Sequence, residues 1–266
     1  MSMLNHYCQR QQPRAPIIHW MNIDIEQSWR SKSADFIPSV KKGYDEKVFG
    51  TERLAVFWAT QQDYVVLRAP PPVAWLQHLE ERGIDLPTII VLEDPVAYID
   101  AEQVFQLIDD HHRQVVLNPY VVTDDVVKLS RTAGLKLLGS DASLVMQLNN
   151  KVAQRNLLEE AKIPVPEGRL FNSSSELLDY VQSNTIENVI GHVIKLPYGA
   201  SGQGLFIIES EQSVINLCHL LQRLSTNIEG VVVFERWYET THNLNYNLNL
   251  IEGKASKPQL RDLKEQ

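Results

Sequence analysis

The chain has 266 residues, 44% of them hydrophobic and 22% charged, so it is long enough for two compact domains and apolar enough to bury a core in each. Its 25 Lys and Arg against 33 Asp and Glu give a net charge of −8, which disfavours non-specific binding to nucleic acid or acidic membranes. A polar N-terminus, the absence of a long apolar run and only two distant cysteines, Cys8 and Cys218, predict a soluble cytoplasmic protein without disulfides.

The first half of the chain alternates between apolar strands and helices. A polar arm is expected over residues 1–14, and three prolines at 70–72 end the second of two apolar runs, 53–58 and 64–67. Further strands are predicted at 15–22, 87–92, 115–117 and 135–138, and helices at 73–82, 102–111 and 123–134. The run at 87–92 is almost continuously apolar, which is typical of a strand buried on both faces of a parallel sheet. This spacing indicates βαβ units, so we expect an α/β domain with an open parallel sheet over residues 15–139.

A largely helical, amphipathic segment, 143–162, opens the second half. Within it, Asn149 and Asn150 can cap a fresh helical start, which places Lys151 in the first helical turn. A cation is unfavourable at that end of the helix dipole, unless an anion binds there and is gripped by the free N–H groups as well. Lys151 is therefore either an exposed surface lysine or part of an anion site.

A β-hairpin with a glycine-rich tip is predicted next. The β-branched run 189–196 indicates a strand, and 205–208 indicates the returning strand. Between them lies a glycine-rich loop, residues 199–204, which contains Gly199, Gly202 and Gly204. Lys195 has apolar surroundings, where a charge is costly unless an anion lies nearby, and the glycines let backbone N–H groups approach a ligand. A phosphate group would satisfy both features. The alternative is an ordinary hairpin whose lysine reaches out to water.

The remaining elements follow in order. Ser173 and Glu176 form a capping box before a helix, and a second helix is expected over 211–224. An apolar strand at 231–238 precedes an alternating strand at 242–250, whose four asparagines either face solvent or face a ligand. A hairpin turn is predicted at 252–253, and the chain then finishes in a charged tail at 260–266.

Four of these blocks, in this order and spacing, resemble the ATP-grasp superfamily of carboxylate–amine and carboxylate–thiol ligases. The blocks are the segment 148–168, the strand end 193–197, the glycine-rich loop and the strand 231–238. Each is weakly specific alone, whereas the series is strongly specific. The resemblance implies an α+β ATP-grasp domain over 140–266, with a truncated second subdomain, after a pre-ATP-grasp α/β domain over 15–139.

The resemblance also implies a nucleotide site. Lys151 and Lys195 match family lysines that contact nucleotide phosphates, and the glycine-rich loop matches a flap that folds over them. Glu235 opens a connection whose backbone holds the adenine edge in family members, and His242 falls where many relatives have a carboxylate for the ribose. The residues expected to bind ATP are Lys151, Lys195, Gly199, Ser201, Gly202, Gly204, the Glu235 side chain, the Arg236 carbonyl, the Tyr238 N–H and His242. No catalytic residue is assigned.

The family's Mg²⁺ ligands are the part of the pattern that this sequence does not offer. Family members hold Mg²⁺ with an acidic residue on a late strand and a Glu-x-Asn pair, because the ion demands hard oxygen ligands. No Glu-x-Asn follows Tyr238, and the acids there are Glu239, Glu252, Asp262 and Glu265. Three explanations stay open: a fragment of a longer ligase, a shortened inactive relative, or a site completed by a partner chain.

Two functions are therefore expected from the resemblance. The first is an ATP-dependent ligase, in which a small-molecule carboxylate attacks the γ-phosphate and an amine captures the acyl phosphate. The alternative is an inactive relative that binds a nucleotide or a partner protein. Neither involves nucleic acid or a membrane, and a homodimer is compatible with both.

Overall fold

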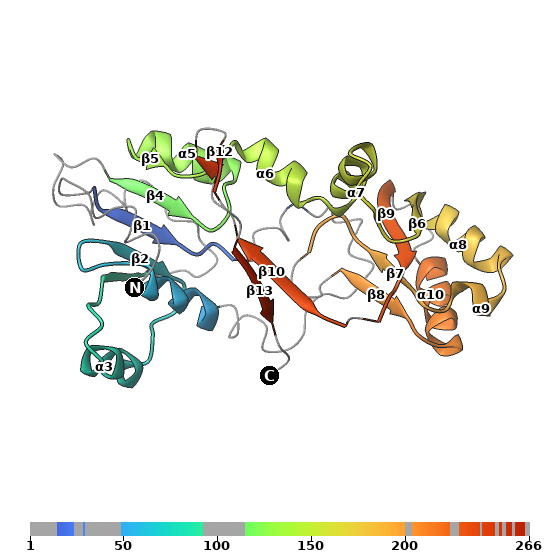
Figure 1. The fold of residues 1–266 in the computed structure, drawn as a ribbon, viewed down its shortest axis with the longest axis horizontal. Helices are drawn as coiled ribbons and strands as arrows, with labels where there is room; N and C mark the ends of the chain where they lie inside the picture. Colours follow the sequence, from blue (N-terminus) through green and yellow to red (C-terminus); the bar gives the residue numbers. More distant parts are fainter. Residues whose placement is uncertain are drawn as a thin grey trace.

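The computed structural model describes residues 15–23, 29, 49–92, 115–199, 204–223, 229–239, 241–247, 250–251, 254–256 and 259–263. The polar arm at 1–14 and the helix expected at 102–111 lie outside these ranges. Figure 1 shows one sheet at each end of the molecule and a strand pair between them. No helix in the described ranges is both long and apolar enough to cross a membrane.

The first half forms a five-stranded parallel sheet, as predicted. Its strand order is β3-β2-β1-β4-β5, and every pairing in it is parallel. The strands are β1 (Ile17–Trp20), β2 (Tyr64–Leu67), β3 (Thr88–Val91), β4 (Val116–Pro119) and β5 (Lys136–Leu137). The prediction that the run at 87–92 is buried on both faces was wrong: β3 is an edge strand, and Thr88 and Val91 are exposed.

Three helical segments accompany the described strands of this sheet, and a side-chain cap begins one of them. The apolar run at 53–58 is a 3-10 helix, η3 (Arg53–Phe57), and α3 (Val73–Glu81) follows the three prolines. The predicted cap at Thr123 is confirmed, since its hydroxyl accepts a hydrogen bond from the Val126 N–H at the start of α5 (Asp124–Thr132). Strands β2 and β4 contribute side chains that are almost fully buried, among them Val65, Val66 and Leu117.

The long segment after this sheet is two helices, as the Asn149–Asn150 pair predicted. Asp141 caps α6 (Ala142–Asn149), and hydrogen bonds from the Ser143 hydroxyl and from backbone N–H groups hold the pKa of this carboxyl below its usual range. Asn150 caps α7 (Lys151–Glu160): its side-chain oxygen accepts from the N–H groups of Val152 at 2.9 Å and Ala153 at 3.2 Å. The break arises because Asn150 has an extended backbone (φ −77°, ψ 115°). The domain boundary expected at 139/140 falls between β5 and α6 and stays a prediction.

The second half forms a four-stranded antiparallel sheet in the order β6-β9-β7-β8. The strands are β6 (Gly168–Ser173), β7 (His192–Lys195), β8 (Leu205–Ile208) and β9 (Glu229–Arg236). The hairpin of β7 and β8 is confirmed, but β7 begins three residues later than predicted. Residues Ile186–Val189 form the short helix α9, and Gly191, with φ 80°, turns the chain into the strand.

Two helices pack on this sheet through a single apolar core. They are α8 (Ser174–Ser183) and α10 (Glu211–Arg223). The predicted cap of α8 is present, since the Ser173 hydroxyl accepts a hydrogen bond from the Glu176 N–H. Core side chains include Phe171, Leu177, Val189, Ile194, Leu217 and Phe234. This core holds β7 and β9 in register, which positions the residues described in the next section.

The C-terminal region forms two further strand pairs. Strands β11 (Leu250–Ile251) and β12 (Lys254–Ala255) pair antiparallel, and the turn predicted at 252–253 lies between them, outside the described residues. The sequence predicted no strand in the charged tail at 260–266, but β13 (Gln259–Leu263) pairs with β10 (Asn243–Asn247). The polar composition of this segment did not indicate a strand, because β13 is defined by its backbone pairing with β10. Figure 1 shows β10 and β13 between the two larger sheets.

Truncation of Leu177 tests this core. Leu177 is fully buried, so Leu177→Ala removes apolar contacts and leaves a cavity, and we expect a loss of about 2–5 kcal/mol in the free energy of unfolding. Leu157→Ala, on the exposed side of α7, is the matched control and should change it by less than about 0.5 kcal/mol. Urea unfolding followed by circular dichroism measures both, and equal effects would contradict the assignment of this core.

Candidate functional site

The N-terminus of α7 lies against the chain that leaves β7. The Lys151 N–H donates to the Pro197 carbonyl at 2.8 Å, and the Lys151 ammonium donates to the Gly199 carbonyl at 2.6 Å. On the other side of the glycine-rich loop, the Leu196 N–H donates to the Gly204 carbonyl at 2.8 Å. Lys151, the end of β7 and both ends of the loop therefore lie together. Ser201 and Gly202, within the loop, are outside the described residues.

The N–H groups of α7 are already paired, which corrects one expectation from the sequence. Free N–H groups were expected there to grip an anion. Instead, the Lys151 N–H binds the Pro197 carbonyl, and the Asn150 side chain takes the next two. An anion at this end of α7 would therefore meet the positive end of the helix dipole and the Lys151 side chain.

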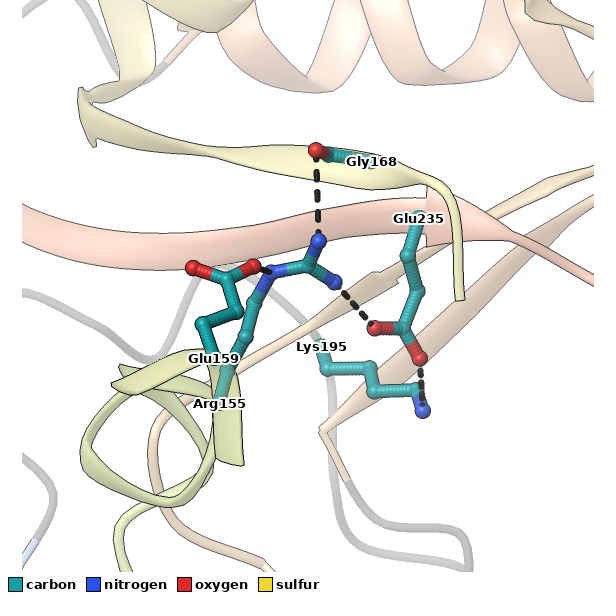
Figure 2. A network of polar contacts seen from close by, with 5 residues as sticks. All are labelled: Arg155, Glu159, Gly168, Lys195 and Glu235. Carbon is teal, nitrogen blue, oxygen red and sulfur yellow. Dashed lines mark hydrogen bonds and ion pairs between the residues drawn. The ribbon is translucent and has the colours of Figure 1, made fainter. Parts of the chain in front are cut away.

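Glu235 supplies a buried carboxylate at the end of β9. It is only 5% exposed and is paired across the sheet with Val193, while Lys195 is paired with Val233. This two-residue offset places Lys195 and Glu235 diagonally on the same face of the sheet. The Lys195 ammonium forms an ion pair with Glu235 Oε1 (Figure 2).

Arg155 is a third member of the cluster, and the sequence reasoning missed it. Its Nη1 contacts Glu235 Oε2 at 3.0 Å, its Nε contacts Glu159 at 2.9 Å, and its Nη2 donates to the Gly168 carbonyl at 3.3 Å (Figure 2). The one available signal was spacing: Arg155 follows Lys151 by four residues, so both project from the same side of α7.

A glycine is required where β6 passes Glu235. A Cβ atom at Gly168 would lie 2.2 Å from the Phe234 carbonyl oxygen and 2.5 Å from the Glu235 Cα, closer than such atoms can approach. The absence of a side chain thus lets β6 run against β9 at this point. It also leaves the Gly168 carbonyl within reach of Arg155.

The other expected residues lie beyond the cluster or in its margin. Arg236 and Tyr238 follow Glu235 at the end of β9 and are exposed, and the Arg236 N–H binds the Glu167 carbonyl at 2.7 Å. Gly199 and Gly204 both have positive φ, 144° and 75°. His242 is exposed and its Nδ1 lies 3.2 Å from the hydroxyl of its neighbour Thr241, so its described contacts do not connect it to the lysines.

The cluster is suited to binding a polyanion. Lys151 and Lys195 are each held by an acceptor of the protein itself, and a phosphate chain could replace both acceptors. Among the described residues, no group of three His, Cys, Asp or Glu side chains is placed to hold a metal ion. Of the acids that follow Tyr238, Glu239 is exposed and Asp262 lies on β13, whereas Glu252 and Glu265 lie outside the described residues.

Comparison with solved structures decides the fold. An N5-carboxyaminoimidazole ribonucleotide synthetase solved with ADP matches with a TM-score of 0.52 and 14% identity, over 95% of this chain and 55% of that one. The biotin carboxylase domain of Hydrogenobacter thermophilus 2-oxoglutarate carboxylase, solved with MgADP, matches with a TM-score of 0.55 and 12% identity, over 96% of this chain and 51% of that one. The chain shares the fold of these enzymes, as the resemblance to the ATP-grasp superfamily predicted.

A curated relative that is similar in sequence is also a ligase. The chain is 28% identical over 239 residues to the [butirosin acyl-carrier protein]–L-glutamate ligase of Niallia circulans, a match that covers 89% of this chain and 53% of the relative. The chain therefore spans about half the length of this relative. No protein-family model matches it.

Removal of the α7 cap tests the support of Lys151. Asn150→Ala deletes the acceptor for two backbone N–H groups, so we expect a loss of about 1 kcal/mol in the free energy of unfolding, whereas Asn150→Asp should retain most of it. Asn149→Ala is the matched control, because that side chain only donates to the Val145 carbonyl at the end of α6. Chemical denaturation measures all three variants, and a control as destabilised as Asn150→Ala would contradict the cap's role.

Proposed function

We propose that this chain forms the nucleotide-binding part of an ATP-dependent carboxylate–amine ligase. The observation that carries the proposal is the convergence of two lysines and one buried carboxylate at the ends of a glycine-rich loop. The lysines supply charge for phosphates, and the carboxylate supplies an acceptor for a base. Such a combination fits a nucleoside triphosphate better than a simple anion, because a simple anion has no base that could donate a hydrogen bond to Glu235.

The phosphate half of the site would use Lys151 and Lys195. Each ammonium would exchange its present acceptor, the Gly199 carbonyl or Glu235, for phosphate oxygens that carry more charge. Release of the Gly199 carbonyl would also free the start of the loop 199–204 to fold over the phosphates. Mg²⁺ bound with the nucleotide would neutralise charge on the β- and γ-phosphates, which is its usual contribution to phosphoryl transfer.

The base half would use the end of β9. The Glu235 carboxylate would accept a hydrogen bond from the adenine amino group, and the Arg236 carbonyl and Tyr238 N–H would bind the adjoining edge. Arg236 is the last residue of β9, where it is paired with His192, and Tyr238 lies two residues beyond the end of that strand. His242, whose Nδ1 lies 3.2 Å from the Thr241 hydroxyl, is the residue that we propose for the ribose hydroxyls.

The proposed chemistry is activation of a carboxylate as an acyl phosphate. A carboxylate oxygen attacks the γ-phosphorus, the bond to the β–γ bridging oxygen breaks, and ADP leaves. An amine then attacks the acyl carbon and inorganic phosphate leaves, while the surplus amine proton passes to solvent. The curated relative is named for joining L-glutamate to an acyl-carrier protein, which makes L-glutamate the first carboxylate to test here.

Nucleotide binding is tested by thermal shift. ATP with Mg²⁺ at about 100 times its Kd stabilises the bound state by about 2.7 kcal/mol, so the melting temperature should rise by several degrees. Lys195→Ala should abolish the rise, measured against the melting temperature of the same variant without ATP. Lys128→Ala, an exposed lysine on α5, should keep it. No rise in the wild type at millimolar ATP would argue against any nucleotide site.

Acyl phosphate formation is tested by trapping. With ATP, Mg²⁺ and L-glutamate, hydroxylamine should intercept the acyl phosphate as a hydroxamate, and one ADP should appear for each hydroxamate. ADP release without hydroxamate would contradict this route. ATP binding with neither product would instead favour the alternative that the sequence left open, a nucleotide-binding relative without turnover.

A further inference from the structure

We infer that Arg155 is a positioning residue for base selection: it holds the Glu235 carboxylate so that one oxygen accepts from the 6-amino group of adenine, which disfavours 6-oxo purines. The inference rests on the proposed nucleotide function and adds to it. Arg155 would not touch the nucleotide. It would act through the orientation of a side chain that does.

Arg155 is suited to this task because it is fixed on three sides. Its side chain is 8% exposed, and its three guanidinium nitrogens contact Glu159 on its own helix, the Gly168 carbonyl on β6 and Glu235 on β9. A guanidinium is planar, so three contacts in different directions determine its orientation (Figure 2). Lysine has a single nitrogen and could not reproduce this set.

The two oxygens of Glu235 have different partners. Oε2 contacts Arg155 and Oε1 contacts Lys195, whose side chain is more exposed, at 27%. If Lys195 moves to a phosphate, Oε1 loses its partner while Oε2 keeps Arg155. A buried carboxylate oxygen without a donor is costly, so the vacated Oε1 requires one.

This requirement distinguishes the purines. Adenine presents an amino group at position 6, which donates to Oε1. Hypoxanthine and guanine present a carbonyl oxygen there, which repels Oε1 and leaves it without a donor. A site built to bind a donor rejects an analogue that lacks it, because the buried polar group is then left unpaired. The effect depends on Arg155, since without it the carboxylate could rotate or pair again with Lys195.

A purely structural role for Arg155 makes a different prediction. If Arg155 only joined α7 to the sheet, its loss would lower the stability of the protein and weaken the binding of all nucleotides alike. If Arg155 positions Glu235, its loss changes the affinity for the base and leaves the affinity for the phosphates unchanged. The ratio of ATP affinity to ITP affinity therefore separates the two roles, and inorganic tripolyphosphate reports on the phosphate half alone.

The experiment measures binding of ATP, ITP and tripolyphosphate by calorimetry with the full 266-residue chain. Wild type should bind ATP about ten- to a hundredfold more tightly than ITP, as one hydrogen bond to a charged group implies. Arg155→Met should bring this ratio to within about threefold of one, with tripolyphosphate affinity unchanged. Arg155→Lys should fall between them. The matched control is Arg169→Met, which removes an arginine that stacks on Tyr180 and should retain the wild-type ratio.

The outcomes separate this inference from the proposed function. If the wild type binds neither ATP nor tripolyphosphate, the proposed function is overturned, and the inference with it. Binding of ATP with an unchanged ratio in Arg155→Met, or equal binding of ATP and ITP by wild type, overturns the inference alone. If Arg155→Met does not fold, the double variant Arg155→Met/Glu235→Gln removes the unpaired charge. Its amide can donate or accept, so its ratio should also lie near one, and a retained preference for ATP overturns the inference.

Discussion

The buried carboxylate of Glu235 is the point on which the second half of the molecule depends. It lies between Arg155 from α7 and Lys195 from β7, and Arg155 continues the connection to β6 through the Gly168 carbonyl. A charge at 5% exposure is tolerated only with such partners, and breaking a buried pair of this kind typically costs about 3–5 kcal/mol. One helix and three strands are thus joined by a polar contact rather than by the apolar core alone.

The same contact joins the architecture to the proposed chemistry. Both lysines of the site are held by acceptors within the chain, Lys195 by Glu235 and Lys151 by the Gly199 carbonyl. A nucleotide would compete for each ammonium with an existing partner, so binding would be an exchange of acceptors. Because one of these acceptors begins the glycine-rich loop and the other is the penultimate residue of β9, the exchange would act on both halves of the proposed nucleotide site.

Much of the fold followed from local patterns in the chain. Capping residues at Thr123, Asn150 and Ser173 were identified correctly, because a cap involves backbone groups only two or three residues away. The parallel sheet and the β7–β8 hairpin also followed from the order of apolar runs. The errors arose where neighbours in space decide: β3 is an edge strand and 259–263 forms a strand against β10, and neither fact is visible in the composition of the segment.

The site shows the same division. By itself, the sequence determined which residues carry charge at the ends of predicted elements, and the family pattern selected Lys151, Lys195 and Glu235 from them. Only the tertiary structure decided that Arg155 meets Glu235, 80 residues away, and that Gly168 must lack a side chain where β6 crosses that point. The reason is physical: hydrogen bonds within a helix turn are set by nearby residues, whereas contacts between elements depend on strand register and packing, which are properties of the whole fold.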